Sequence, residues 1–214
     1  MSRLAAFALV AATGLALPAA ATIMVPLSLA ELTQDSSLIV RGRVRDRSAA
    51  WDDQHQKIYT TAVIDILDTV WSKRSVGLQI KVRTLGGEVG DLGMKVAGTP
   101  DLKVGEEVLL FLREDSKVPA EFAVIGMNQG RFTVFQDSTG RVMAKPTWDG
   151  IAFAKPGEDG VLRVGGEHEL PVEQTYVDLR KNILELKARP APTRPSITPP
   201  SVPSAPAAPK STTK

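Results

Sequence analysis

Between residues 22 and 187, apolar and polar positions alternate with period two along most of the chain, so the fold must be built mainly of β-strands. In residues 38–47 the even positions as far as Val44 are apolar or glycine, while arginines occupy most of the odd positions. Within residues 106–114 the run VLLFL has no polar position, which predicts a strand buried on both faces. Further strands are predicted at 58–70, 78–85, 122–127, 131–136 and 141–145.

Two segments break this alternation and predict helices. Ser28 and Glu31 have the spacing of a capping box, which predicts a short N-terminal helix. Apolar residues three and four apart predict an amphipathic C-terminal helix over residues 172–187. Together with the strands, these helices predict a mainly β fold, a small OB-like barrel that is closed or half-closed. A β-sandwich is the alternative.

The two ends of the chain differ from this region. Residues 1–21 have a basic start, an apolar run and small residues before Thr22, which predicts a signal peptide. The apolar run is shorter than a membrane span, so no transmembrane segment is expected after cleavage. Residues 188–214 hold eight of the 15 prolines and no acid, which predicts a disordered Pro-rich tail. The expected product is one domain, residues 22–187, located in the periplasm or secreted.

Composition excludes several functions. The chain contains no cysteine, so disulfides, thiolate zinc sites and thiol nucleophiles are absent. Residues 22–187 carry 21 Lys and Arg against 24 Asp and Glu, so we expect no nucleic-acid partner. The glycines of 84–100 lack the G-x-G-x-x-G and G-K-[ST] patterns, and acids stand where a phosphate would bind. We interpret that stretch as a wide, glycine-bent connection between two barrel strands.

A run of bases forms the candidate ligand-binding site. Period two places the arginines of residues 38–47 on one face of one strand, and Lys81 with Arg83 on one face of another. Such a face on an OB-type barrel can bind an anionic glycan. The other interpretation is a solvated outer face on which acids such as Asp65 pair with the arginines across the strands. The candidate residues are Arg41, Arg43, Arg45, Arg47, Lys81 and Arg83.

Four stretches of the chain carry a family resemblance. LIVRGRV, WDDQHQKIYTTAVIDILD, RTLGGEVGDLGMKVAGTPDLKVGEEVLLFL and GMNQGRFTV resemble an uncharacterised family of secreted bacterial proteins. The resemblance covers about residues 27–145, and more loosely the terminal helix. The short helix followed by SSLIVRGRV is distantly similar to netrin-module and metalloproteinase-inhibitor OB barrels. Those inhibitors chelate zinc through an N-terminal cysteine, a residue type that this chain lacks.

The chain contains two histidines, His55 and His168, and neither lies in a catalytic or metal-binding motif. No spacing brings together a nucleophile, a base and an orienting group, so we expect no enzyme, cofactor or metal. The sequence therefore predicts an exported, non-catalytic binding module of the cell envelope, with an envelope protein or an anionic glycan as partner. The alternatives are a metalloprotease-inhibitor-like protein and a polyanion binder acting through the arginines.

Overall fold

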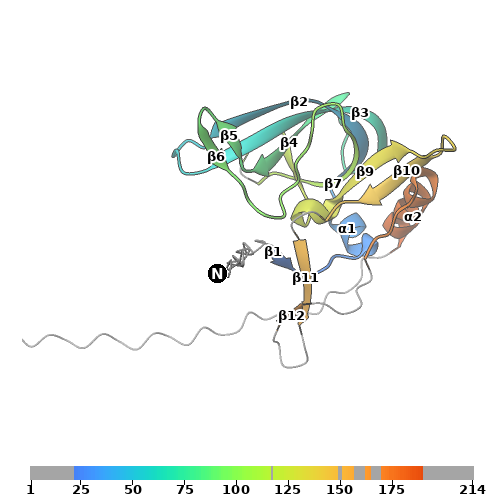
Figure 1. Ribbon diagram of the computed structural model, residues 1–214. Coiled ribbons are helices and arrows are strands. Elements are labelled where there is room, and N and C mark those ends of the chain that lie inside the picture. The colour runs from blue at the N-terminus through green and yellow to red at the C-terminus, as the bar shows by residue number, and fades with distance from the viewer. Residues whose placement is uncertain (1–21, 117, 149–150, 157–161, 165–169, 190–214) are drawn as a thin grey trace, which may run out of the picture.

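A computed structural model describes residues 22–116, 118–148, 151–156, 162–164 and 170–189 of the chain (Figure 1). The expected signal peptide, the Pro-rich segment beyond Arg189 and His168 lie outside the described residues. Within the described ranges, no helix has the length and apolar character needed to cross a membrane. The elements are β1 (Thr22–Met24), α1 (Leu29–Asp35), β2 (Leu38–Trp51), β3 (Ile58–Ser72), β4 (Gln79–Leu85), β5 (Gly87–Val89), β6 (Leu92–Met94), β7 (Glu107–Glu114), β8 (Glu121–Val124), the 3₁₀ helix η1 (Met127–Gly130), β9 (Arg131–Gln136), β10 (Val142–Pro146), β11 (Ile151–Pro156), β12 (Leu162–Val164), β13 (Gln174–Thr175) and α2 (Tyr176–Ala188).

Five of these strands form a closed barrel. They follow one another in the order β7-β2-β3-β4-β8, and pairing of β8 with β7 closes the ring. All neighbours are antiparallel except β4 and β8, which run parallel. The predicted small OB-like barrel is confirmed, and its closure rules out the sandwich alternative.

Strand β7 lies between two apolar cores, as the unbroken run VLLFL predicts. Val108, Leu110 and Leu112 point into the barrel and pack with residues of the other four strands. Leu109 and Phe111 point outward into a second core, which α1, α2, β9 and β10 cover. All five side chains are fully buried. Since burial of one such side chain contributes on the order of 2 kcal/mol, β7 is a main source of stability for both cores.

Both helices belong to the second core, on the outside of the barrel. The capping box of α1 is present, because Ser28 Oγ accepts from the Glu31 N–H at 3.3 Å and Glu31 Oε2 accepts from the Ser28 N–H at 2.9 Å. The C-terminal helix begins at Tyr176 rather than at residue 172, which corrects the sequence prediction. Its N-cap is Thr175, which with Gln174 first pairs to β10 as β13, so the chain is extended up to that point.

Polar contacts near both ends of α2 attach it to the rest of the domain. The Tyr176 hydroxyl donates to Asp68 Oδ2 on β3 at 2.6 Å, and burial together with this bond raises the pKa of the phenol. At the other end of α2, Lys187 Nζ lies 3.5 Å from the centre of the Trp71 ring and donates to the Ser36 carbonyl at 3.0 Å. Burial, aided by the charge of Lys73, lowers the pKa of the Lys187 amine to about 8.

The glycine-rich stretch turns the chain out of the barrel at the end of β4. Gly86 and Gly87 have φ of 104° and 138°, values that side chains rarely adopt. A Cβ on Gly87 would lie only 2.9 Å from Ala49 Cβ, because β5 packs closely over the far ends of β2 and β3. The expected bent connection between two barrel strands is present, with the small hairpin β5–β6 inside it.

The segment after β7 differs from the sequence prediction. The strand expected over 122–127 ends at Val124, and η1 follows it. Gly126 and Met127 have φ of 61° and 57°, so two consecutive residues take the left-handed conformation and reverse the chain.

The turn expected at 137–140 is present, with Gly140 at φ 82° and the Asp137 N–H donating to the Arg141 carbonyl.

We predict that Gly87→Ala lowers the free energy of unfolding by about 3 kcal/mol, from an unfavourable φ plus overlap with Ala49. Gly90→Ala is the matched control, since Gly90 has φ of 59° and a Cβ added there would meet open space. This substitution should lower the free energy of unfolding by only about 1 kcal/mol. Urea denaturation of the two variants gives both values. Equal losses would contradict close packing of β5 on the barrel.

We also predict that the protein becomes more stable as pH rises from about 8 towards 10, through Lys187. The pKa of its amine is about 8 when folded and near its ordinary value of 10.5 when unfolded, so in this window the unfolded state binds more protons. Denaturation in a pH series measures the slope. Lys187→Met should flatten it, whereas the exposed Lys181→Met should not.

Candidate functional site

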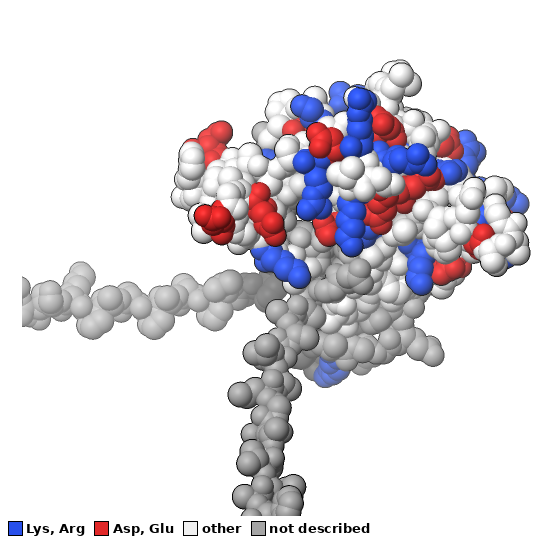
Figure 2. Space-filling view, turned by 45° about the horizontal axis from the view of Figure 1, so that its top comes forward, with Lys and Arg blue, Asp and Glu red and all other residues white. Residues whose placement is uncertain are grey.

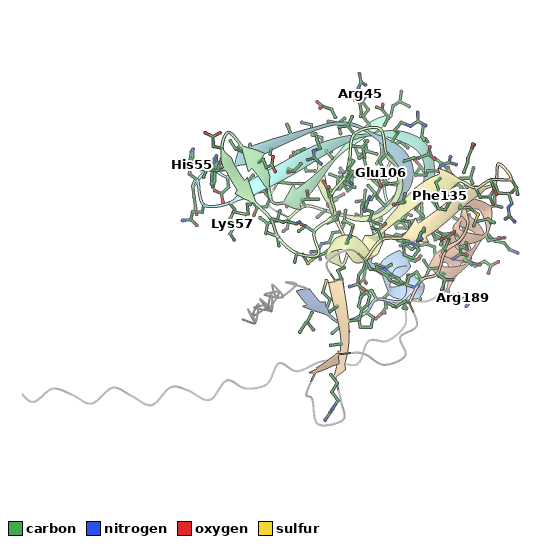
Figure 3. All side chains as sticks on the ribbon, viewed as in Figure 1. Arg45, His55, Lys57, Glu106, Phe135 and Arg189 are labelled. Atoms are coloured by element: carbon green, nitrogen blue, oxygen red, sulfur yellow. The ribbon has the colours of Figure 1, made fainter. Side chains whose placement is uncertain are left out.

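Three of the predicted arginines lie on the outer surface of the barrel, where acids pair with them. The Arg41 and Arg43 guanidinium groups lie 2.5 and 3.4 Å from the Glu107 carboxylate on β7. Arg45 projects from this surface (Figure 3) and lies 3.7 Å from Asp65 on β3. Figure 2 shows acids and bases interleaved over this side of the molecule. The surface therefore has balanced charge and is not an open basic patch.

Arg47 does not share a face with the other three, which corrects the expected ladder of four. The register between β2 and β3 shifts between Val44 and Asp46, so one extra residue is accommodated in β2. Arg47 is then opposite Ala62, whose side chain belongs to the barrel core. Arg47 consequently lies at the open end of the barrel, where it pairs with Asp101 at 2.7 Å.

Lys81 and Arg83 lie on the outer face of β4, as expected, but β3 separates that strand from the arginines of β2. Arg83 stacks on the Tyr59 ring, with 3.7 Å between the guanidinium carbon and the ring centre. Its Nε is 3.9 Å from Glu121 Oε2, an atom that is buried and accepts no hydrogen bond within the described structure. Only 15% of the Arg83 side chain is exposed, so the Tyr59 ring holds the guanidinium in one place.

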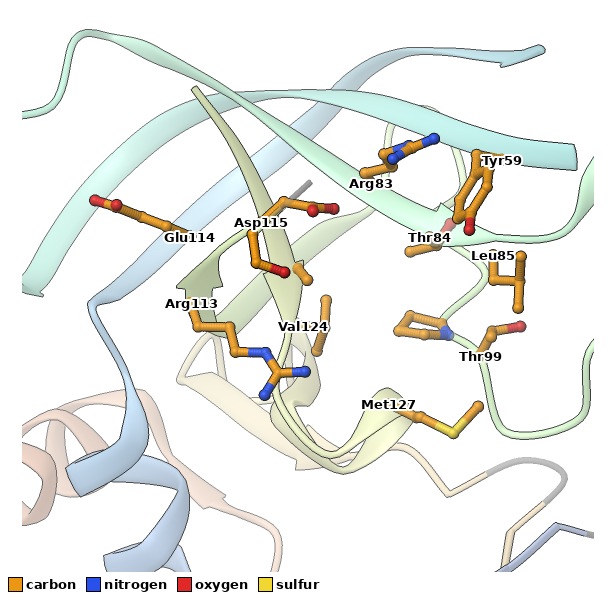
Figure 4. A pocket seen from close by; sticks show the side chains of 13 residues that line it. Tyr59, Arg83, Thr84, Leu85, Thr99, Arg113, Glu114, Asp115, Val124 and Met127 are labelled. Carbon is orange, nitrogen blue, oxygen red and sulfur yellow. The ribbon is translucent and has the colours of Figure 1, made fainter. Parts of the chain in front are cut away.

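Arg83 and Tyr59 form one wall of a cleft of about 540 Å³ in the side of the barrel (Figure 4). Leu85 and Thr99 form a second wall, and Arg113 and Met127 lie across from them. The lining combines apolar groups with hydroxyl groups, two guanidinium groups and two carboxyl groups, those of Glu114 and Asp115. This composition and size are those of a small-ligand or peptide site.

The cleft exists because the barrel closes incompletely between its two parallel strands. Only two residue pairs join β4 to β8, Lys81 with Glu121 and Val82 with Phe122. Beyond these two pairs, β4 continues to Leu85 and β8 continues to Val124, but the two strands no longer pair with each other and therefore diverge. The cleft lies in this widening gap, since both strand ends line it.

Arg113 is the one guanidinium of the cleft without an acid partner among the described residues. It is exposed and lies opposite Ala123 in the pairing of β7 with β8. Its neighbour Glu114 points away from the cleft and pairs with Arg74 at 3.0 Å. Across the cleft floor, Met127 holds a left-handed φ of 57°, a strained conformation of the kind that is frequent at binding sites.

A second cleft of about 480 Å³ adjoins the first at the mouth of the barrel. The glycines around β5 and β6 cover it, and Arg47 and Glu88 contribute charges of opposite sign. The two clefts have four lining residues in common, Thr84, Leu85, Thr99 and Pro100. The end of β4 is thus accessible along both its side and its tip.

The loop with Asp52, Asp53 and His55 lies at the tip of the β2–β3 hairpin (Figure 3), and none of these three residues lines the cleft. The Asp52 carboxylate accepts the Gln56 and Lys57 N–H groups, and these bonds, led by that of Gln56, lower the pKa of Asp52. The carboxylate therefore closes a turn. Over the described ranges, no group of three metal-binding side chains converges.

The sequence did not identify Tyr59, Arg113 and Met127 as site residues. Arg113 follows directly after VLLFL, where a charge is expected at any strand end. The alternation in β3 and β4 places Tyr59 and Arg83 on the same face of the sheet, so their proximity could have been predicted from the sequence. The left-handed Met127 has no sequence signature, because tertiary packing imposes it.

Comparison with known protein families finds none that the chain matches, and comparison with curated proteins finds no relative. The function of this domain must therefore be inferred from the geometry and chemistry of the cleft.

We predict that Met127→Gly raises the free energy of unfolding by roughly 1 kcal/mol, because glycine takes a left-handed φ without strain. Ala120→Gly is the matched control outside the cleft, since Ala120 has φ of 69° and should gain a similar amount. Urea denaturation measures both. A loss of stability for Met127→Gly alone would show that the Met127 side chain supports the fold instead of lining a binding site.

Proposed function

We propose that this chain is an exported binding module of the cell envelope, which holds its ligand in the cleft between β4 and β8 without transforming it. The observation that carries the proposal is the cleft itself, an opening with polar and apolar walls in an otherwise closed barrel. The N-terminal sequence pattern supports export.

The cleft residues are suited to recognition. Tyr59 and Arg83 form a rigid stacked pair that can contact a planar or anionic group. The apolar side chains of Leu85, Val124 and Met127 can bury the rest of the ligand. Arg113 has no internal ion pair within the described residues to compete with a bound anion.

The arginines on the outer surface support a structural role better than polyanion binding. A polyanion would have to displace Glu107 and Asp65 from Arg41, Arg43 and Arg45. The side chains of Arg43 and Arg45 are largely exposed, so their ion pairs contribute little each. The acids of all three pairs nevertheless cancel the attraction that a long anion would feel. We therefore assign ligand binding to the cleft.

We predict that filling the cleft abolishes ligand capture. Ala123 lines the cleft beside Arg113, so Ala123→Trp places a large ring in the opening. Wild-type protein, Ala123→Trp and the surface control Arg45→Gln are each exposed to native envelope extract, and bound proteins and small molecules are identified by mass spectrometry. Wild type and Arg45→Gln should retain the same ligand, chemically unchanged, and Ala123→Trp should lose at least nine-tenths of it.

Two results would refute the proposal. Retention of the ligand by a folded Ala123→Trp protein would place the site elsewhere. Recovery of a chemically altered ligand, at a rate that depends on the protein, would show that the domain is an enzyme.

A further inference from the structure

The free end of β4 presents unpaired backbone groups to the cleft. The Gly86 N–H donates to the Ile58 carbonyl and the Ile66 N–H to the Leu78 carbonyl, each at 2.8 Å, so even-numbered residues of β4 bond to β3. Arg83 and Leu85 are odd-numbered, and their N–H and C=O groups therefore point towards β8. Because pairing with β8 stops at Val82, the Arg83 carbonyl and the backbone groups of Leu85 have no strand partner among the described residues.

The facing strand is open in the same way. The Asp115 N–H donates to the Glu121 carbonyl at 2.8 Å and the Ile125 N–H to the Phe111 carbonyl at 2.9 Å, so odd-numbered positions bond to β7. Val124 is even-numbered and directs its backbone groups across the cleft towards β4. Two strand edges thus face each other across a gap lined by Leu85 on one side and Val124 on the other.

Such edges match the backbone of an extended peptide. Donors and acceptors on one side of a strand recur every second residue, about 6.6 Å apart, which is the repeat of another strand. Addition of a strand to an open sheet edge is a general mode of peptide recognition. An oligosaccharide has no such repeat of alternating N–H and C=O groups.

Charge selects the kind of peptide. Two acids also line the cleft, but Glu114 pairs with Arg74 and the Asp115 carboxylate accepts the Val118 N–H. Arg113 has no ion pair among the described residues, so its guanidinium group would bind a carboxylate. The chain's own residues 188–214 do not meet this requirement, since they contain four bases, no acid and eight prolines that lack an N–H. The occupant is therefore expected to be a different chain.

We infer that the cleft binds an extended peptide segment of a partner protein, added as a strand to β4 at Arg83–Leu85, with an acidic side chain of the peptide on Arg113. The inference rests on the proposed function and names its ligand class. Tyr59 and Met127 would contact the side chains that flank the acidic one.

A pool of phage-displayed random octapeptides, selected on the intact protein, tests the inference. Selected peptides should be enriched in Asp or Glu at one position. A synthetic copy of the best binder is then compared with two analogues, one with that acid replaced by its amide and one with alternate amides N-methylated. Fluorescence anisotropy should give a tenfold weaker Kd for the first and no measurable binding for the second.

Protein variants identify the partner groups. Leu85→Pro removes the N–H that faces the cleft while leaving the ladder with β3 intact, so it should weaken binding at least tenfold. Leu85→Ala keeps that N–H and is its matched control. Arg113→Gln should weaken the acidic peptide tenfold and leave its amide analogue unchanged, and Arg45→Gln should affect neither.

If Leu85→Pro fails to fold, amide hydrogen exchange of the wild type replaces it. Bound peptide should then slow exchange of the Leu85 N–H and leave the solvent-facing amides of the β2–β3 turn unchanged. Three results would overturn the inference: no peptide selected, binding that survives N-methylation, or binding indifferent to Arg113→Gln. Each would leave the binding module itself standing if Ala123→Trp still abolishes capture of the envelope ligand, so the two failures are distinguishable.

Discussion

Burial of β7 on both of its faces is the interaction on which the rest of the domain depends. Its even-numbered residues complete the barrel core, and Leu109 and Phe111 anchor the layer of helices and strands outside the barrel. Because one strand belongs to both cores, packing of the barrel and packing of the outer layer are coupled through it. The helices α1 and α2, which are too short to be stable alone, are ordered by this outer core.

The parallel pairing of β4 with β8 is the weak point of the closed barrel and also its opening. Four neighbouring pairs are antiparallel, and the ladder from β2 to β3 spans nearly the whole length of both strands. The parallel pair has two residue pairs, after which the strand ends separate. The short pairing of β4 with β8 therefore both closes the barrel and leaves the cleft open, since longer pairing here would leave no cleft beside Arg83.

The charged residues show how one irregularity changes the interpretation of a pattern. Period two placed four arginines on one face, and the structure keeps Arg41, Arg43 and Arg45 there. The register shift before Asp46 turns Arg47 to the barrel mouth. A bulge depends on how two strands pair, and no characteristic residue marks it in this sequence. The alternation within β2 alone could therefore not reveal it.

The sequence by itself determined the β class, the doubly buried strand, the capping box at Ser28, the turn before Gly140 and the glycine-bent exit from β4. Each of these follows from local propensity or from side-chain periodicity, which neighbouring residues alone specify. Only the tertiary structure decided barrel closure, the helix start at Tyr176, the strain at Met127 and the meeting of Tyr59, Arg83 and Arg113 in one cleft. These features depend on contacts between segments far apart in the chain, whose register is set when the two cores pack.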